Sequence, residues 1–547
     1  MALSKIFASA RASLTAPRLA RIELACAIVV CAAIAVLITI FRLNSLEMRM
    51  ADNVGYEHLL NTIRMTGGMR SDLFTSVLKI IESRAMEMTS RDYVNLVRDY
   101  DINDQRDILR FHTYFILYLV APFTAVASAT KILAATTGIA FAAVVAIAYV
   151  WLRRAGVGLL AAAAFTIIVM LHPGWGVAVF GQFYPDRFFI PLALAFAIAI
   201  HLRWLTTALI VGLIAILITE RAPSVLGLFL AGYGICFYRP GQARKAAIIV
   251  TSGLALIALG SVLQSLFITN LHYSAFLPQS PNELLLRLLN RDKRGQLWVL
   301  LAVNAGLLVL ACFQPRTLPI VASMLVPNAI GDVGGAEKTG FLTHYHSYYF
   351  PILIWAAGLG YIQLLALIRA FVVRKGLNSL SSSAIALAVC VTIAMPGFVD
   401  WSNFRRIKLS WKFASDTNVT LRAPSLWRES YGKEWTYFRQ ARRQTREMFQ
   451  SAAIVSAPEN VLWAAPLSAR VFMFPVAMDR ATHLGVVCNA AKPTEWTGVH
   501  TFASGDGRTE IEHAFRERAR SLGFDVDNPQ CGPLNIGYVS KAASATK

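Results

Sequence analysis

Charged residues are scarce in this sequence. Only 15% of its 547 residues are Asp, Glu, Lys or Arg, whereas 56% are hydrophobic and the mean hydropathy is +0.51. Soluble globular chains average about 45–50% apolar and about 25% charged residues. This shortage of charge excludes an ordinary water-soluble globular protein, and it indicates that lipid is the solvent for most of the chain.

Cysteine is also rare, and its seven positions exclude a zinc site because no Cys/His group has the necessary spacing. Cys488 and Cys531 fall in the C-terminal part, where they could form one disulfide if that part lies in an oxidising compartment. The remaining five lie in apolar runs, where cysteine acts as a small hydrophobe: Cys26, Cys31, Cys236, Cys312 and Cys390. No metal is assigned, and the cofactor requirement is left unknown.

No small-residue cleavage site follows the first apolar run, so we interpret that run as a retained anchor rather than a cleaved signal peptide. Further apolar runs follow it, and together they predict about eleven membrane spans. The predicted spans are 22–41, 130–152, 156–172, 188–202, 204–219, 223–238, 246–269, 296–314, 317–330, 348–368 and 380–397.

Acidic residues are missing from one predicted side of the membrane. With a cytoplasmic N-terminus, the cytoplasmic segments contain no acid and fourteen basic residues: Lys5, Arg11, Arg18, Arg21, Arg153, Arg154, Arg203, Arg239, Arg244, Lys245, Arg316, Arg369, Arg374 and Lys375. Such an excess on one side is typical of cytoplasmic loops. We therefore attribute the net charge of +20 to topology and expect no nucleic-acid partner.

The predicted fold is mainly α, with a transmembrane helical bundle and a small α/β domain. Residues 1–21 form a cytoplasmic N-terminus, 22–397 the membrane domain and 398–547 a non-cytoplasmic soluble domain. Within the membrane domain, 42–129 is a large outer loop that ends in an interfacial helix over 111–128. The predicted C-terminal elements are helices over 427–449 and 509–522, the latter ended by Gly523, and strands near 453–455, 461–464 and 471–475.

Asp52 is the candidate catalytic residue, because it lies about ten residues beyond the outer end of the first span. A carboxylate at that level could take a proton from a substrate hydroxyl. The alternative is a solvated loop carboxylate or a helix N-cap.

Other candidate residues for substrate binding lie at span ends. His112 opens the predicted interfacial helix, and it could bind a phosphate or donate a proton. Two adjacent pairs, Asp186 with Arg187 and Glu220 with Arg221, flank predicted spans. Ionisable residues at this depth usually face a partner or a water-filled cavity. The alternative for each pair is a simple ion pair or a side chain that reaches the interface.

His344 and His346 belong to the densest polar and aromatic cluster, Thr343–Pro351, at the entrance of a span. An aromatic-belt anchor would explain the tyrosines of this cluster but not the histidines. Imidazole donors could instead hold a lipid-linked phosphate, which we favour over metal binding because no carboxylate set accompanies them.

The ordered set of motifs resembles a family of bacterial polytopic membrane proteins that is distantly similar to the GT-C glycosyltransferases. The matching stretches are Asp52–Tyr56, His112–Pro122, Phe183–Arg187, Thr219–Arg221 and His344–Pro351, with a faint match over Val461–Pro475. Tyr184 and Asp186 stand where relatives have His and Glu, and Thr219-Glu220-Arg221 stands where Lys-Glu is usual, so the chain departs from the family pattern there.

This resemblance implies a GT-C-like enzyme of the bacterial inner membrane, with its C-terminal domain in the periplasm. The enzyme would transfer a sugar, with inversion, from a polyprenyl-phosphate donor to a hydroxyl of a glycan, lipid or protein acceptor. Asp52 would act as general base and Asp186 would be the second acid, while Arg221, His344 and Arg187 would stabilise the leaving phosphate. Two alternatives remain open: a transporter or flippase for a lipid or anionic solute, and a non-catalytic membrane scaffold.

Overall fold

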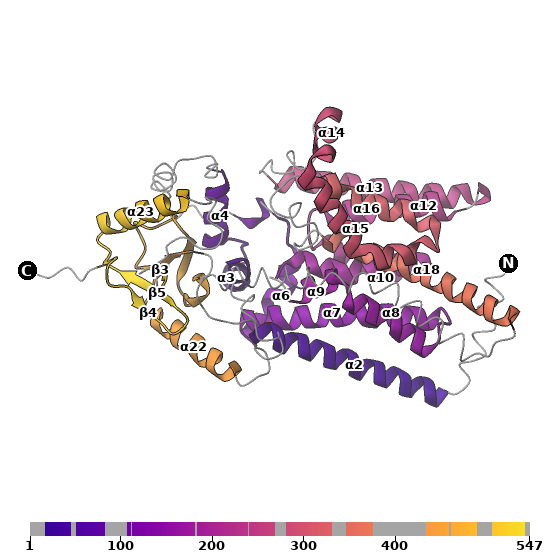
Figure 1. Ribbon diagram of the computed structural model, residues 1–547, viewed down its shortest axis with the longest axis horizontal. Coiled ribbons are helices and arrows are strands. Elements are labelled where there is room, and N and C mark those ends of the chain that lie inside the picture. Colours follow the sequence, from indigo (N-terminus) through magenta and orange to yellow (C-terminus); the bar gives the residue numbers. More distant parts are fainter. Residues whose placement is uncertain are drawn as a thin grey trace, which may run out of the picture. The chain divides into compact units, whose positions relative to one another are not determined.

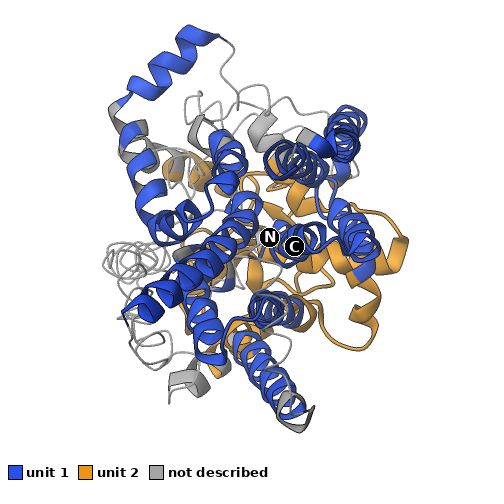
Figure 2. Ribbon diagram, turned by 90° about the vertical axis from the view of Figure 1, so that its right-hand side faces the viewer, with its two compact units in different colours: residues 1–39, 109–119, 134–402 blue, residues 40–108, 120–133, 403–547 orange. Residues whose placement is uncertain are grey.

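The computed structural model describes residues 17–44, 51–82, 107–110, 112–180, 183–238, 240–268, 280–330, 346–375, 434–458, 461–488 and 506–541. The chain divides into two compact units, which Figure 2 colours separately. Unit 1 comprises residues 1–39, 109–119 and 134–402, and unit 2 comprises residues 40–108, 120–133 and 403–547.

Unit 1 is helical (Figure 1). Its main helices are α2 (Pro17–Asn44, whose last residues belong to unit 2), α6 (Ile116–Val120), α7 (Ala129–Arg154), α8 (Leu159–Leu171), α9 (Pro173–Phe180), α10 (Phe189–His201), α11 (Leu205–Ile216), α12 (Ala222–Phe237), α13 (Ala243–Phe267), α14 (Pro281–Leu289), α15 (Arg291–Cys312), α16 (Leu318–Ile330) and α18 (His346–Arg374).

The first ten predicted spans all coincide with helices, whereas the eleventh, 380–397, lies outside the described residues. By length and composition, four helices could cross a membrane: Arg21–Leu43, Ala129–Arg154, Ala243–Phe267 and His346–Arg374. The other predicted spans fall on apolar helices that are shorter or less apolar than this. A count of eleven spans and a GT-C-like arrangement therefore stay predictions.

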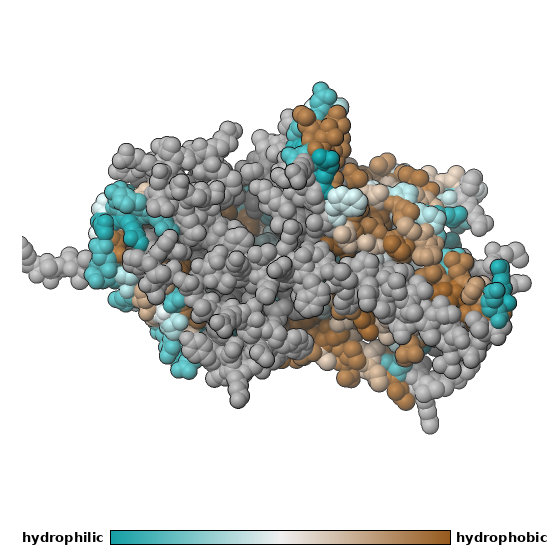
Figure 3. All heavy atoms as spheres, in the orientation of Figure 1, coloured by the Kyte–Doolittle hydropathy of each residue, from teal (hydrophilic) through white to brown (hydrophobic). Residues whose placement is uncertain are grey.

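Helix α18 is the central helix of unit 1. Its Trp355 is fully buried, with its ring 5.1 Å from Phe229 and 5.7 Å from Phe237, both of α12. By contrast, α2 and α13 are strongly apolar yet largely exposed, and Figure 3 shows hydrophobic residues gathered over α12 and α13. A large exposed apolar surface of this kind favours contact with lipid.

An ion pair joins α2 to α7, the first two predicted spans. Arg153 Nη2 donates to Glu23 Oε2 at 2.7 Å, and the Tyr149 hydroxyl donates to Glu23 Oε1 at 2.7 Å. The helices touch at Gly138, where a Cβ would come within 2.4 Å of the Ala35 carbonyl oxygen. Because Glu23 is near the start of α2 and Arg153 is at the end of α7, the two helices are antiparallel, as consecutive spans must be.

The predicted interfacial helix over 111–128 is two short helical turns, α6 and the 3₁₀ helix η4 (Ala121–Ala125). Pro122 in the first turn of η4 cannot donate a helical hydrogen bond, which accounts for the break. Leu119, Phe123 and Val126 are more than half exposed. These exposed apolar side chains agree with a segment that meets the membrane interface.

Unit 2 contains a five-stranded sheet with β1 (Ile454–Ala457), β2 (Arg470–Met473), β3 (His483–Val487), β4 (Gln530–Cys531) and β5 (Ile536–Ser540). The strand order is β2-β1-β3-β5-β4; β1 pairs in parallel with β2 and β3, and β5 is antiparallel to β3 and β4. The register places Val455 opposite Val471 and His483. Helices α22 (Glu434–Met448) and α23 (Asp506–Ser521) complete this small α/β domain, confirming the predicted class.

Two helices of the predicted first outer loop, α3 (Ala51–Thr66) and α4 (Asp72–Glu82), belong to the same unit as the sheet. Val54 of α3 and Leu73 of α4 lie in one buried cluster with Val455, Trp463 and Val471 of the C-terminal domain. The sequence predicts that residues 42–129 belong to the membrane domain and residues 398–547 to a separate soluble domain. In the structure, segments of both belong to one compact unit, although they are about 400 residues apart in sequence.

Most predicted elements of the C-terminal domain are present, with one exception. Segment 461–464 is not a strand, because Leu462–Ala464 forms the 3₁₀ helix η9. All three of its residues are buried, and a short buried apolar run does not distinguish a strand from a helical turn. Gly523 ends α23 with a φ of 85°, as predicted, and Cys488 and Cys531 form a disulfide with a Cα–Cα distance of 5.9 Å.

Acidification is expected to destabilise unit 2 through His58 of α3. Burial lowers the pKa of His58 to about 4, while Asp72 opposes this shift and Arg446 adds to it. Since an unfolded histidine titrates near pH 6.5, the unfolded chain binds more protons between these values, and stability falls as the pH drops. We expect a loss of about 2 kcal/mol from this residue between pH 7 and pH 5.

Urea unfolding of the detergent-solubilised protein, followed by pulse proteolysis of C-terminal-domain fragments, measures this loss. A His58→Gln variant should lose clearly less stability on acidification than the wild type. Some dependence should remain, because burial also lowers the pKa of His483. The exposed His513 provides the control: His513→Gln should leave the pH dependence unchanged. Equal pH dependence in all three proteins would contradict the role of His58.

Candidate functional site

Glu220 is the centre of a buried polar network in unit 1. It lies in the turn between α11 and α12, and its side chain is 0% exposed. Its Oε1 atom is 3.2 Å from Nδ1 of His112 and 3.7 Å from Nε of Arg221. Its Oε2 atom accepts hydrogen bonds from the Thr113 N–H at 3.2 Å and the Thr219 hydroxyl at 3.0 Å. These donors compensate for the cost of burying a carboxylate.

A second buried carboxylate, Asp186, lies beside this network. It belongs to the 3₁₀ turn η5 (Pro185–Phe188), which precedes α10, and it is 1% exposed. The Tyr114 hydroxyl donates to Asp186 Oδ2 at 2.8 Å, and the Tyr348 hydroxyl donates to Oδ1. Two phenol donors therefore satisfy one oxygen each.

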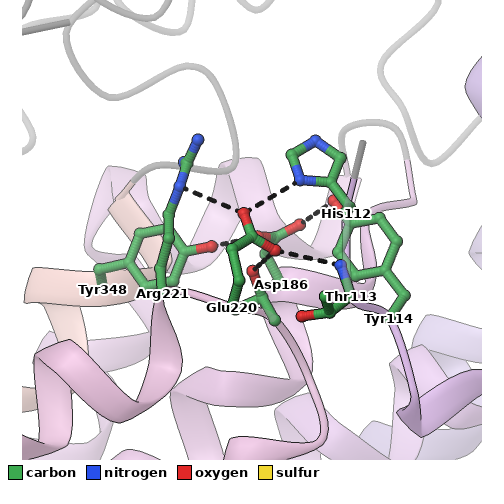
Figure 4. A network of polar contacts seen from close by, with 8 residues as sticks. His112, Thr113, Tyr114, Asp186, Glu220, Arg221 and Tyr348 are labelled. Atoms are coloured by element: carbon green, nitrogen blue, oxygen red, sulfur yellow. Dashed lines mark hydrogen bonds and ion pairs between the residues drawn. The ribbon is translucent and has the colours of Figure 1, made fainter. Parts of the chain in front are cut away.

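Aromatic contacts connect the two carboxylates, as Figure 4 shows. The Arg221 guanidinium lies 5.7 Å from the Tyr348 ring centroid, and the His112 ring lies 4.8 Å from the Tyr114 ring. Arg221 and His112 flank the Glu220 carboxylate, and both extend to the same side of it (Figure 4). Their side chains are 16% and 12% exposed, so both are more accessible than the carboxylate that holds them.

Helix ends bring these residues to one level. Glu220 follows the end of α11 and Arg221 precedes α12, which has Pro223 in its first turn. The His112 segment is fixed to the same turn because the Ile116 N–H donates to the Leu217 carbonyl at 2.7 Å. Starts of α10, α12 and α18 thus meet the end of α11. This agrees with the alternating topology, while the side of the membrane that they face stays a prediction.

The arrangement suits the binding of an anion. A carboxylate only accepts hydrogen bonds, so His112 presents a protonated Nδ1 to Glu220 and its orientation is fixed. Arginine is planar and permanently charged, and it matches the geometry of phosphate oxygens. Glu220 therefore holds two phosphate-binding side chains in a defined geometry, one of which can also transfer a proton.

Arg187 and Tyr184 form a contact of their own next to Asp186. The Arg187 guanidinium lies 5.4 Å from the Tyr184 ring centroid. Arg187 is 3% exposed, whereas Tyr184 is partly exposed. Both residues belong to the segment that carries Asp186, so this pair lies on the side of the second carboxylate rather than in the turn that carries Glu220.

His346 lies on the opposite face of α18 from Tyr348. Successive residues of an α-helix are about 100° apart, which places His346, Tyr349 and Phe350 on one side and Tyr348 on the other. His346 is fully buried, and its ring lies 6.2 Å from Phe350. The His172 ring stacks on the same Phe350 ring, at 4.8 Å. His346 thus lies in the interior packing of unit 1.

Two predicted site residues cannot be compared with this network. Asp52 is the second residue of α3, in unit 2, and its side chain is not among those described. His344 lies outside the described residues. The roles assigned to both stay predictions.

Sequence reasoning missed three contributors: Tyr114, Tyr348 and the backbone N–H of Thr113. Tyr114 lies two residues after His112, and Tyr348 lies in the cluster that contains His346. An aromatic belt was one explanation of the tyrosines of that cluster, but the Tyr348 hydroxyl donates to a buried carboxylate. Tyrosine residues close to ionisable residues at span ends were the available signal.

Among the side chains that the structure describes, no group of three or more His, Cys, Asp or Glu residues could hold a metal ion. No protein-family description, curated protein or solved structure matches this chain. The resemblance to GT-C enzymes therefore stays an expectation from sequence motifs.

Glu220→Gln tests whether the carboxylate holds the network together. The amide can still accept from Thr113, but the charge that attracts Arg221 and His112 is lost. We expect a loss of about 2 kcal/mol in unfolding free energy, as is typical for hydrogen bonds to a charged group.

The matched control is Glu283→Gln, which removes the charge from an i,i+4 pair with Arg287 on α14. That pair is partly exposed, so its loss should cost under about 0.5 kcal/mol. Thermal or urea unfolding in detergent measures both. Equal losses of unfolding free energy in the two variants would show that the Glu220 charge contributes no more to stability than a surface ion pair does.

Proposed function

We propose that this chain is a membrane glycosyltransferase that uses a polyprenyl-phosphate-linked sugar. The observation that carries the proposal is the buried Glu220 carboxylate with Arg221 and His112 on either side of it. Charge-assisted hydrogen bonds from such a pair are well suited to a phosphate. In the transfer step they would stabilise the negative charge that develops on the leaving phosphate.

The position of the network supports a lipid-linked rather than a water-soluble donor. Arg221 and Glu220 lie between two apolar helices, α11 and α12, at their ends. A polyprenyl chain would lie in the hydrocarbon, while its phosphate would lie at this level. Polar residues gathered at helix ends favour one-sided chemistry over alternating access, for which sites near the bilayer midplane are expected.

The proposed reaction follows from the resemblance to GT-C enzymes. Asp52 takes the proton from the acceptor hydroxyl, whose oxygen attacks the anomeric carbon of the sugar. The bond from that carbon to the phosphate oxygen breaks, and its electron pair leaves with polyprenyl phosphate. A single displacement inverts the anomeric configuration.

Two observations support a non-cytoplasmic location for the chemistry. The Cys488–Cys531 disulfide lies in unit 2, which also contains Asp52, and disulfides persist in oxidising compartments such as the periplasm. The predicted cytoplasmic loops carry the basic residues. We therefore propose that the C-terminal domain lies in the periplasm and that the protein lies in the inner membrane.

Replacing the proposed base should slow transfer strongly without removing the protein from the membrane. We expect Asp52→Asn to lower the rate about 10²–10⁴-fold, the usual contribution of general base catalysis. Purified protein in liposomes, supplied with a panel of polyprenyl-phosphate hexoses and membrane-extracted acceptors, is assayed for release of polyprenyl phosphate. The control is Asp479→Asn, a partly exposed carboxylate in the same unit. Wild-type transfer by the Asp52 variant would refute the proposed mechanism.

Phosphate recognition can be tested separately from transfer. We expect Arg221→Gln to weaken binding of a polyprenyl monophosphate about 10–100-fold, the equivalent of about 1.4–2.7 kcal/mol. Arg316→Gln, an exposed position before α16, should bind like the wild type. Native mass spectrometry measures the affinities, with the free polyprenol as ligand control. Unchanged binding by the Arg221 variant would remove the basis of the proposal.

A further inference from the structure

An edge of the C-terminal sheet is covered by a helix from the first outer loop. In the described sheet, β2 is an edge strand that pairs with β1 alone. On this strand, the Met473 N–H donates to the hydroxyl of Ser76 in α4 at 2.9 Å. An open strand edge offers unpaired backbone groups to other chains, and covering it with a helix is one way to prevent that. Helix α4 thus covers the open edge of the sheet.

A bidentate ion pair fixes α4 to the same strand. Arg470, the first residue of β2, donates to both oxygens of Asp72, the first residue of α4, at 2.8 and 2.7 Å. The Asp72 side chain is 9% exposed and that of Arg470 is 31% exposed. A two-point contact of this kind restricts orientation as well as distance. The register of α4 along β2 is therefore defined.

Helix α3, which carries Asp52, packs against both α4 and the C-terminal domain. Tyr56 lies 5.1 Å from Phe74 of α4, ring to ring. Gly55 leaves room for the same ring, because a Cβ there would lie 2.8 Å from it. Val54 belongs to the buried cluster of the C-terminal domain, and Asn53 is fully buried. The residues that follow Asp52 in the chain are thus held on the domain.

We infer that the C-terminal α/β domain positions Asp52, with Asp72 and Arg470 as positioning residues. This inference rests on the proposed role of Asp52 as general base. It gives the domain a mechanical role: the domain is the support that sets where helix α3 begins. A displaced base loses rate even when the substrate still binds, and a shift of about 1 Å can cost about 100-fold.

Charge reversal and charge swap test the inference. Asp72→Arg and Arg470→Asp each oppose like charges across the α4–β2 contact, whereas the double variant restores opposite charges. We expect each single variant to lower kcat about 10–100-fold, with KM for the polyprenyl-phosphate hexose changed less than about twofold. The double variant should recover most of the lost kcat. Ser76→Ala, which removes a single hydroxyl from the α4–β2 contact, is the milder variant should a reversal prevent folding.

The control is Arg443→Asp, which opposes like charges in the exposed Arg443–Glu447 pair of α22, in the same domain. It should leave kcat unchanged. Hydrogen exchange provides the structural readout: amides of α3, α4 and β2 should exchange faster in the single variants and return to wild-type protection in the double variant.

The outcomes separate this inference from the proposed function. If Asp52→Asn is inactive but the single reversals keep wild-type kcat, the positioning role is overturned and the proposed base stands. Faster exchange with unchanged kcat likewise reduces the contact to a stabilising one and overturns the inference. If Asp52→Asn transfers at the wild-type rate, the proposed role of Asp52 as base fails and the positioning role fails with it. Absence of transfer by the wild type would instead overturn the proposed function. Loss of kcat in the singles and recovery in the swap supports the inference.

Discussion

The buried charge of Glu220 is the constraint on which the polar site of unit 1 depends. A carboxylate with no exposed surface needs donors from several directions, and they come here from a loop, a turn and a neighbouring side chain. His112 is 108 residues away in sequence, so this one charge ties the segment before α6 to the α11–α12 turn. Through Arg221 and Tyr348 it also reaches the start of α18. Helix ends that would otherwise be independent are thereby held in one geometry.

Helix α18 transmits this constraint inward, because both faces of its first turn are engaged. Tyr348 binds Asp186 on one side, while on the other Asn304 of α15 donates to the Tyr349 hydroxyl at 3.3 Å. Below this turn, Trp355 lies among the aromatic side chains of α12. Helix α18 therefore contacts the polar network with its first turn and the apolar core of unit 1 with the turns that follow.

The sequence predicted helices where apolar runs were long, since run length and composition are local properties. It also brought forward His112, Asp186, Glu220 and Arg221 as candidates, and the resemblance implied one shared site. It did not predict which side chains hold the two carboxylates, because the partners of a buried carboxylate lie far along the chain. The role of Tyr348 was left open for the same reason: an aromatic residue at a span end suits both a membrane anchor and a donor to a distant carboxylate. The contact between α4 and β2 could not be predicted either, because nothing in the sequence of one segment identifies the other as its partner.

That contact has a consequence for biosynthesis. Asp72 and Arg470 are 398 residues apart, with the helices of unit 1 encoded between them. At about 5–20 residues per second, α4 leaves the ribosome about 20–80 s before the strand that it covers. During that interval α4 has no sheet to pack against. Once β2 is made, its open edge stays uncovered until α4 binds it. Assembly of unit 2 therefore follows synthesis of the unit 1 helices, and α3 and α4 are exposed to chaperones or proteases during that delay.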